Sequence, residues 1–223
     1  MATRKGRKQT GWFVAEGPKL VADLQEAGFT PVDIFQDVDD VKKVSFLQHP
    51  QGVFAIFEMP TYGQEQAAVD STSLTLALDG IQDPGNLGTI IRVADWFGIS
   101  DIFCSHETAD CWNPKVVQAT MGSIVRVRVH YGSLVSLVGE VSAKCPVYTT
   151  QLDGENIYQT PLTPNGVIVM GNEGNGVTAE VRSLATRRLL VPSYPNLRPT
   201  AESLNVSVAT AIVLGEFRRR MSK

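Results

Sequence analysis

Between residues 74 and 191, short apolar runs alternate with segments whose apolar residues recur at helical spacing. The apolar runs predict six strands: Leu74–Leu78, Asp101–Cys104, Val125–Tyr131, Val147–Thr150, Val167–Met170 and Arg188–Val191. Strands separated by helices indicate an α/β fold with a mainly parallel sheet and helices on both faces. In Val125–Tyr131, valines alternate with Arg126, Arg128 and His130, so we expect this strand near an edge of the sheet.

The helices are predicted from the residues at their ends. Asn113 is a good N-cap, Pro114 suits a first turn and Gly122 is a stop signal, which together predict a helix over Pro114–Met121. Further helices are expected over Leu87–Phe97, Thr178–Leu184 and Ser203–Phe217, the last with Ser203 as its N-cap.

Residues 1–60 predict a small α/β domain, residues 61–73 a linker, and residues 74–223 the main domain. Strands are expected at Trp12–Ala15, Val32–Phe35 and Gly52–Phe57, with a helix over Gly17–Ala27. The stretch from Phe35 to Val41 leaves little room for a further helix and strand. The small domain is therefore either abridged or lacks residues in the given chain.

Composition narrows the class of protein. A chain of 223 residues with 43% hydrophobic residues can form an ordinary soluble core. No apolar run approaches the roughly 20 residues that span a bilayer, and the N-terminus lacks the apolar stretch of a secretory signal. The cysteines Cys104, Cys111 and Cys145 are odd in number and lack the spacing of metal ligands. They favour reduced thiols in the cytoplasm. The three histidines share no ligand spacing, so we expect no structural metal.

Positive charge is concentrated at the two ends of the chain. The net charge is −3, yet residues 1–8 and 218–223 carry 8 of the 20 basic residues and no acid. Positive ends on an acidic body can form a local phosphate-binding face. They can equally be solvated tails, and charge alone leaves both interpretations open.

Three polar segments, of which the first two are rich in glycine, follow or nearly follow predicted strands: Asp83–Arg92, Met170–Gly176 and Glu202–Ala209. The carboxyl ends of parallel strands are where α/β proteins place their chemistry. The second segment does not fit G-x-G-x-x-G and lacks the Lys and Ser/Thr of a phosphate loop, which disfavours a nucleotide-dependent dehydrogenase. Taken singly, Arg92 could be a surface arginine or a partner of Glu173, and the residues of the third segment could be simple helix caps.

Taken together and in this order, the three segments resemble the motifs of the SpoU (TrmH-like) branch of the SPOUT RNA methyltransferases, over about residues 74–220. The resemblance implies a C-terminal trefoil knot, a homodimer, and S-adenosylmethionine as the cofactor. The implied reaction is methyl transfer to a ribose 2′-hydroxyl of structured RNA, either tRNA or rRNA. Phe13–Gly17 and His49–Val53 also resemble the start and end of the small RNA-binding domain that precedes many SpoU domains.

The resemblance also implies the site residues. The catalytic set is Asn86, Arg92, Glu173, Ser203 and Asn205, and the cofactor-binding set is Gly171, Val191 and Leu204. Because a guanidinium does not normally deprotonate, Arg92 is expected to orient the ribose or phosphate and stabilise negative charge, with Glu173 holding it. The alternative is a non-catalytic RNA-binding scaffold, and the presence of all five polar residues argues against it.

Overall fold

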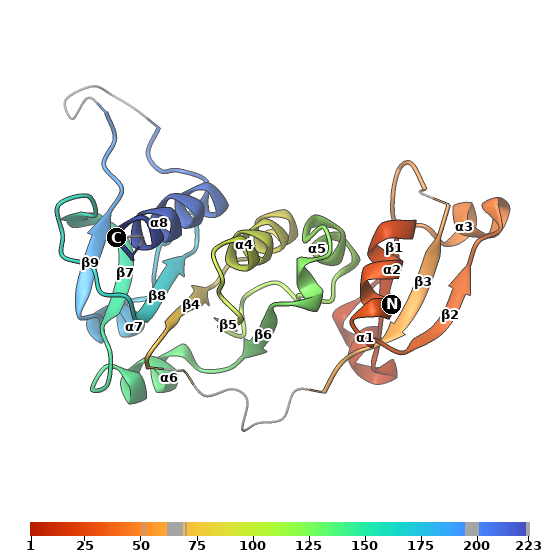
Figure 1. Cartoon of the computed structure of the whole chain (residues 1–223), viewed down its shortest axis with the longest axis horizontal. Coiled ribbons are helices and arrows are strands. Elements are labelled where there is room, and N and C mark those ends of the chain that lie inside the picture. The colour runs from red at the N-terminus through yellow and green to blue at the C-terminus, as the bar shows by residue number, and fades with distance from the viewer. Residues whose placement is uncertain (51, 62–68, 70, 195–200, 222–223) are drawn as a thin grey trace.

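The computed structural model describes residues 1–50, 52–61, 69, 71–194 and 201–221. It contains a three-stranded antiparallel sheet in the N-terminal part and a six-stranded parallel sheet in the C-terminal part (Figure 1).

The six-stranded sheet confirms the predicted fold class. Its strands are β4 (Leu74–Asp79), β5 (Asp101–Cys104), β6 (Arg128–Tyr131), β7 (Val147–Asn156), β8 (Gly166–Gly171) and β9 (Arg187–Leu190). They lie in the order β6-β5-β4-β8-β7-β9, and all neighbours are parallel. Strand β6 lies at an edge, as its alternating pattern predicted, and β4 and β8 are buried along their whole length.

Helices cover both faces of this sheet (Figure 1). One face carries α4 (Pro84–Trp96), α5 (Pro114–Ala119) and α8 (Val206–Met221), and the other carries α6 (Leu134–Val141) and α7 (Ala179–Ser183). The alternation of side chains along a strand explains the two cores. Leu76 and Leu78 belong to the core beneath α4 and α8, while Ala77 between them belongs to the core beneath α6 and α7.

Some predicted boundaries were wrong. The strand expected from Val125 begins only at Arg128, because the chain first turns through a 3-10 helix at Ser123–Val125. The last helix begins at Val206 rather than at Ser203. Asn205 provides its cap, since the Asn205 Oδ1 atom accepts hydrogen bonds from the backbone N–H groups of Ser207 and Val208.

The expected knot concerns the connection between β9 and α8. Residues 195–200 of this connection lie outside the described residues, so the trefoil knot stays a prediction.

The N-terminal part contains α1 (Arg4–Thr10), β1 (Trp12–Glu16), α2 (Pro18–Glu26), β2 (Pro31–Phe35), α3 (Val38–Val44) and β3 (Phe54–Glu58). Its sheet has the order β1-β3-β2. Helix α3 begins within the stretch after Phe35 that was expected to leave little room for a helix. Asp37 caps it by accepting from the N–H groups of Asp39 and Asp40. This part packs beside α5, where the Phe13 ring lies 4.5 Å from the Trp112 ring between centroids.

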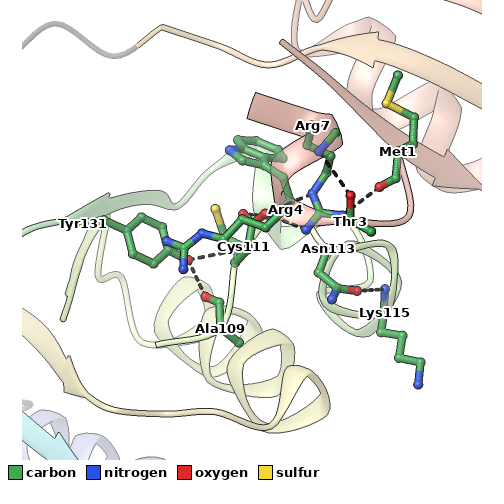
Figure 2. Close-up of polar contacts among 12 residues, drawn as sticks. Met1, Thr3, Arg4, Arg7, Ala109, Cys111, Asn113, Lys115 and Tyr131 are labelled. Carbon is green, nitrogen blue, oxygen red and sulfur yellow. Dashed lines mark hydrogen bonds and ion pairs between the residues drawn. The ribbon is translucent and has the colours of Figure 1, made fainter. Parts of the chain in front are cut away.

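The basic ends of the chain are not simple solvated tails. Arg7 lies in α1 with a side chain only 2% exposed, and it forms an ion pair with Asp110 at 2.6 Å (Figure 2). At the other end, Arg218 donates to the carbonyl of Phe97 at 2.7 Å, and Arg220 donates to the carbonyl of Thr160 at 2.6 Å. These three arginines stabilise the fold, so their charges are not free for RNA.

Candidate active site

The three polar segments meet at one edge of the parallel sheet. Strands β4 and β8 pair in register up to Asp79 and Gly171, so the segments that follow them leave the sheet side by side. The Asn172 side chain donates to the carbonyl of Gly80 at 2.8 Å and joins the two connections directly. Helix α8 packs against both α4 and β8, which brings the third segment to the same place.

The start of α4 positions Asn86. Asp83 caps the helix by accepting from the N–H of Asn86 at 2.8 Å, and Pro84 occupies the first turn, where the missing N–H costs nothing. The helix therefore begins three residues before the predicted Leu87. Asn86 lies in the first turn, half-buried, and faces the other two segments.

A chain of side-chain hydrogen bonds links the three segments. The Asn86 amide donates from Nδ2 to Oε1 of Glu173, and its Oδ1 accepts from Nδ2 of Asn205 at 2.9 Å. Oδ1 of Asn205 in turn accepts from the Ser207 hydroxyl at 2.6 Å. Because both ends of the Asn86 amide have partners, its plane is fixed.

The glycine-rich loop after β8 is held by its own backbone and by a buried carboxylate. Asn172 and Gly176 pair with each other, and an added Cβ at Gly171 would overlap the backbone of Gly176 and Val177. Asp79 is buried and accepts from both the N–H and the hydroxyl of Thr178 at 2.8 Å. Gly171 is therefore required by the loop itself, because the chain doubles back directly against it.

Beside these groups lies a cavity of about 440 Å³. All three predicted cofactor residues, Gly171, Val191 and Leu204, line it, together with the predicted catalytic residues Glu173 and Ser203. Sequence reasoning missed Gln151, which follows the apolar part of β7 and also lines the cavity. Its Oε1 atom is buried and has no hydrogen-bond partner among the described residues, while its Nε2 donates to the Thr149 hydroxyl at 2.7 Å.

Arg92 lies apart from this chain of hydrogen bonds. Its side chain is exposed and makes no hydrogen bond or ion pair with any residue that the structure describes. The expectation that Glu173 holds Arg92 is not met, because the Glu173 carboxylate accepts from Asn86 instead. Arg92 shares the exposed side of α4 with Thr89 and Trp96, at a spacing of three and four residues.

Within the described residues there is no group of three His, Cys, Asp or Glu side chains that could hold a metal ion. None of the helices formed by the same residues is long and apolar enough to cross a membrane.

Several known proteins are similar to this chain. The profile of the SpoU rRNA Methylase family matches residues 73–215. The 23S rRNA (guanosine(2553)-2′-O)-methyltransferase RlmP of Bacillus subtilis is 33% identical, over 97% of this chain and 92% of its own. A TrmH-family putative RNA methyltransferase structure from Porphyromonas gingivalis has a TM-score of 0.87 at 35% identity, covering 98% of this chain and 94% of that one. An AdoMet-bound rRNA methyltransferase structure from Sinorhizobium meliloti has a TM-score of 0.89 at 28% identity, covering 100% and 92%.

Fold, site and comparisons together define an RNA 2′-O-ribose methyltransferase. The chain belongs to the SpoU rRNA methylase family.

Proposed function

We propose that this protein transfers a methyl group from S-adenosylmethionine to a ribose 2′-hydroxyl of ribosomal RNA. The observation that carries the proposal is the hydrogen-bonded chain of Glu173, Asn86 and Asn205 beside the 440 Å³ cavity. A hydrogen-bonded chain next to a cavity suits a reaction with two substrates, because each can hold one of them. Holding both substrates in place is a large part of what the enzyme supplies.

The cavity fits the cofactor. Its volume falls within the range of small-molecule sites, and its wall combines the backbone of the 171–176 loop with the apolar side chains of Val191 and Leu204. Gln151 offers an unpaired buried acceptor, which a ligand N–H group such as an amine would satisfy. S-adenosylmethionine would supply the methyl group here, and the related Sinorhizobium structure contains AdoMet.

The polar residues would act on the ribose. Asn86, with its amide fixed by Glu173 and Asn205, is preorganised to orient a hydroxyl group next to the cavity. Ser203 lines the cavity and is placed to contact either substrate. Arg92 is free of partners among the described residues, so its planar guanidinium can hold a phosphate and stabilise the negative charge that develops on the 2′-oxygen.

Ribosomal RNA is proposed as the substrate because the Bacillus subtilis relative, at 33% identity, is named a 23S rRNA methyltransferase. The test is incubation of the protein with labelled S-adenosylmethionine and separate pools of protein-free rRNA and tRNA, followed by mapping of the modified ribose. Label in rRNA at a 2′-O-methyl position supports the proposal. Label confined to tRNA would overturn the choice of substrate, and no label in either pool would favour the non-catalytic scaffold.

We infer that the protein works as a homodimer, with α4 and α8 facing the second copy. These helices pack against each other, and they expose Trp96 at the end of α4, which is 85% accessible, and Val208 in the first turn of α8. Leu204, just before α8, is exposed as well. Exposed apolar side chains on two helices that pack together favour a protein–protein contact over open solvent. Light scattering should report about twice 24.3 kDa, and Trp96→Ser should shift the protein towards the monomer.

We further propose that residues 1–60 form an RNA-binding domain, supported by their resemblance to the domain that precedes many SpoU domains. A reducing, cytoplasmic location is proposed because Cys104, Cys111 and Cys145 are all free and buried. Fractionation of cells that express the tagged protein would test the location.

A further inference from the structure

A second hollow, of about 430 Å³, lies between α1 and β6, which is the edge strand of the parallel sheet opposite β9. Its wall includes Arg4 and Lys8 from α1, His106 and Trp112 from the segment between β5 and α5, and Tyr131 at the end of β6. None of these residues belongs to the three family motifs. Figure 2 shows the Arg4 guanidinium lying against the Tyr131 ring.

The hollow is positively charged although the chain as a whole is acidic. Arg4, Arg7 and Lys8 line it, and among the described residues of its wall Asp110 is the single carboxylate. Asp110 is engaged by Arg7, which donates to it from both Nε and Nη2. The charges of Arg4 and Lys8 are therefore left uncompensated within the wall.

Arg4 is held in place without using most of its donors. Its guanidinium lies 5.3 Å from the centroid of the Tyr131 ring, and one nitrogen donates to the His106 carbonyl at 3.3 Å. Burial raises the pKa of Tyr131 well above its ordinary value, so the phenol stays neutral and the contact is a cation–π interaction. Four of the five N–H donors of Arg4 remain for a ligand. Lys8 is exposed and makes no hydrogen bond or ion pair with the described residues.

The hollow and the candidate active site are both lined in part by segments that follow the carboxyl ends of strands. The segment after β5, which supplies His106, is joined to the segment after β4 by the Gly80 N–H to Ser105 hydroxyl bond at 3.0 Å. Gly80 also accepts from Asn172 of the glycine-rich loop. One RNA strand that follows the carboxyl ends of the strands can therefore reach both places.

We propose that this hollow, which we call the α1–β6 hollow, binds an unpaired nucleotide of the same RNA whose ribose is methylated at the active site. Arg4 and Lys8 take the phosphate, and the aromatic wall at Trp112 and His106 takes the base. Unpaired bases are recognised by stacking on aromatic side chains and their phosphates by cations, which is the combination found here. The proposal rests on RNA as the substrate, and it makes the hollow a recognition site without a part in methyl transfer.

The test compares two lysines of one helix. Lys8→Glu reverses one charge of the α1–β6 hollow and Arg4→Gln removes another. Lys5→Glu makes the same change as Lys8→Glu on an exposed residue of α1 that does not line the hollow. The probe is protein-free bacterial 23S rRNA transcript, with the dissociation constant measured by filter binding over a range of salt concentrations. The double variant Arg4→Gln, Lys8→Glu should bind at least about tenfold more weakly, with a salt slope flatter by about 1.4 for two lost contacts to a single strand.

Lys5→Glu should bind within about twofold of the wild type, since phosphate contacts act locally at physiological salt. Transcripts that contain 4-thiouridine should crosslink to the segment at residues 105–113. Equal weakening by Lys5→Glu and Lys8→Glu, or unchanged binding by the double variant, would overturn the proposal.

Methyl transfer, measured on the same proteins at saturating RNA, separates this proposal from the proposed function. Variants of the α1–β6 hollow should retain the wild-type turnover rate and lose only affinity. A wild-type protein that binds the transcript through Arg4 and Lys8 but transfers no methyl group would refute the proposed reaction and leave the hollow as an RNA site.

Discussion

Asn86 and Asn205 lie 119 residues apart in the sequence, and their side-chain amides are joined by a hydrogen bond of 2.9 Å. Asn205 performs two tasks with two different atoms. Its Nδ2 donates to Asn86, while its Oδ1 caps helix α8. A single residue thereby ties the first turn of α4 to the first turn of α8.

These two tasks can be separated by mutation. Asn205→Asp keeps an oxygen for the helix cap but replaces the donor to Asn86 by a second acceptor, so we expect the cap to be kept and about 0.5–1.5 kcal/mol of stability to be lost with that hydrogen bond. Turnover should fall by about 100-fold, as for other lost orienting hydrogen bonds in active sites. Asn205→Ala removes both functions and should cost about 1 kcal/mol of stability more than Asn205→Asp. Melting curves and single-turnover rates measured on both variants test this, and a fully active Asn205→Asp protein would contradict it.

Substitution of Arg92 is expected to lower the turnover rate without lowering the stability of the fold. Since its side chain is exposed and has no partner among the described residues, Arg92→Ala should leave the melting temperature and cofactor affinity unchanged. Turnover should fall by at least about 100-fold, and Arg92→Lys should restore little of it, because a point charge does not replace a planar fork. Thr89→Ala, one turn away on the same exposed side, is the control. A stable Arg92→Ala protein with normal turnover would remove Arg92 from the catalytic set.

The sequence was sufficient where local signals decide the structure. The strand at Asp101–Cys104 was predicted with its observed limits, and Asn113 caps α5 by accepting from the Lys115 N–H, as its position predicted. The three motifs were also assigned to one edge of the sheet, because parallel strands place their carboxyl ends together.

Prediction failed where the deciding contact is distant in the sequence. Helix α1 has no apolar face, and its one buried side chain is Arg7, whose partner Asp110 lies 103 residues away. Ser203 and Asn205 are equally good cap residues by type. Val206 is buried in the core beneath α8 and is the first residue of that helix. The residue before it, Asn205, is therefore the cap.

Gly171 and Gly174, at the start and in the middle of the glycine-rich loop, are predicted to respond differently to substitution by alanine. Gly171→Ala would force a Cβ into the backbone of Gly176, so we expect a loss of at least about 1–3 kcal/mol and failure to bind S-adenosylmethionine. At Gly174 an added Cβ would lie 3.5 Å from Oδ1 of Asn172, an ordinary contact. Gly174→Ala should therefore remain folded and bind the cofactor, as calorimetry on both variants would reveal. Equal behaviour of the two variants would show that the close approach at Gly171 is unimportant.

The last prediction concerns acid stability and the buried carboxylate of Glu216 in α8. Hydrogen bonds from Arg219 and Arg220 lower the pKa of Glu216 from its ordinary 4.5 to about 2. A lowered pKa means that the ionised group stabilises the folded state above pH 4.5, and that this contribution disappears as the pH falls towards 2. Glu216→Gln should therefore cost about 1.5–3 kcal/mol at pH 7, the usual range for hydrogen bonds to a charged group. The difference from the wild type should narrow between pH 4.5 and pH 2 in denaturant titrations. Glu140→Gln changes an exposed helical glutamate and should show no such dependence, and a parallel pH profile for the two variants would contradict the assignment.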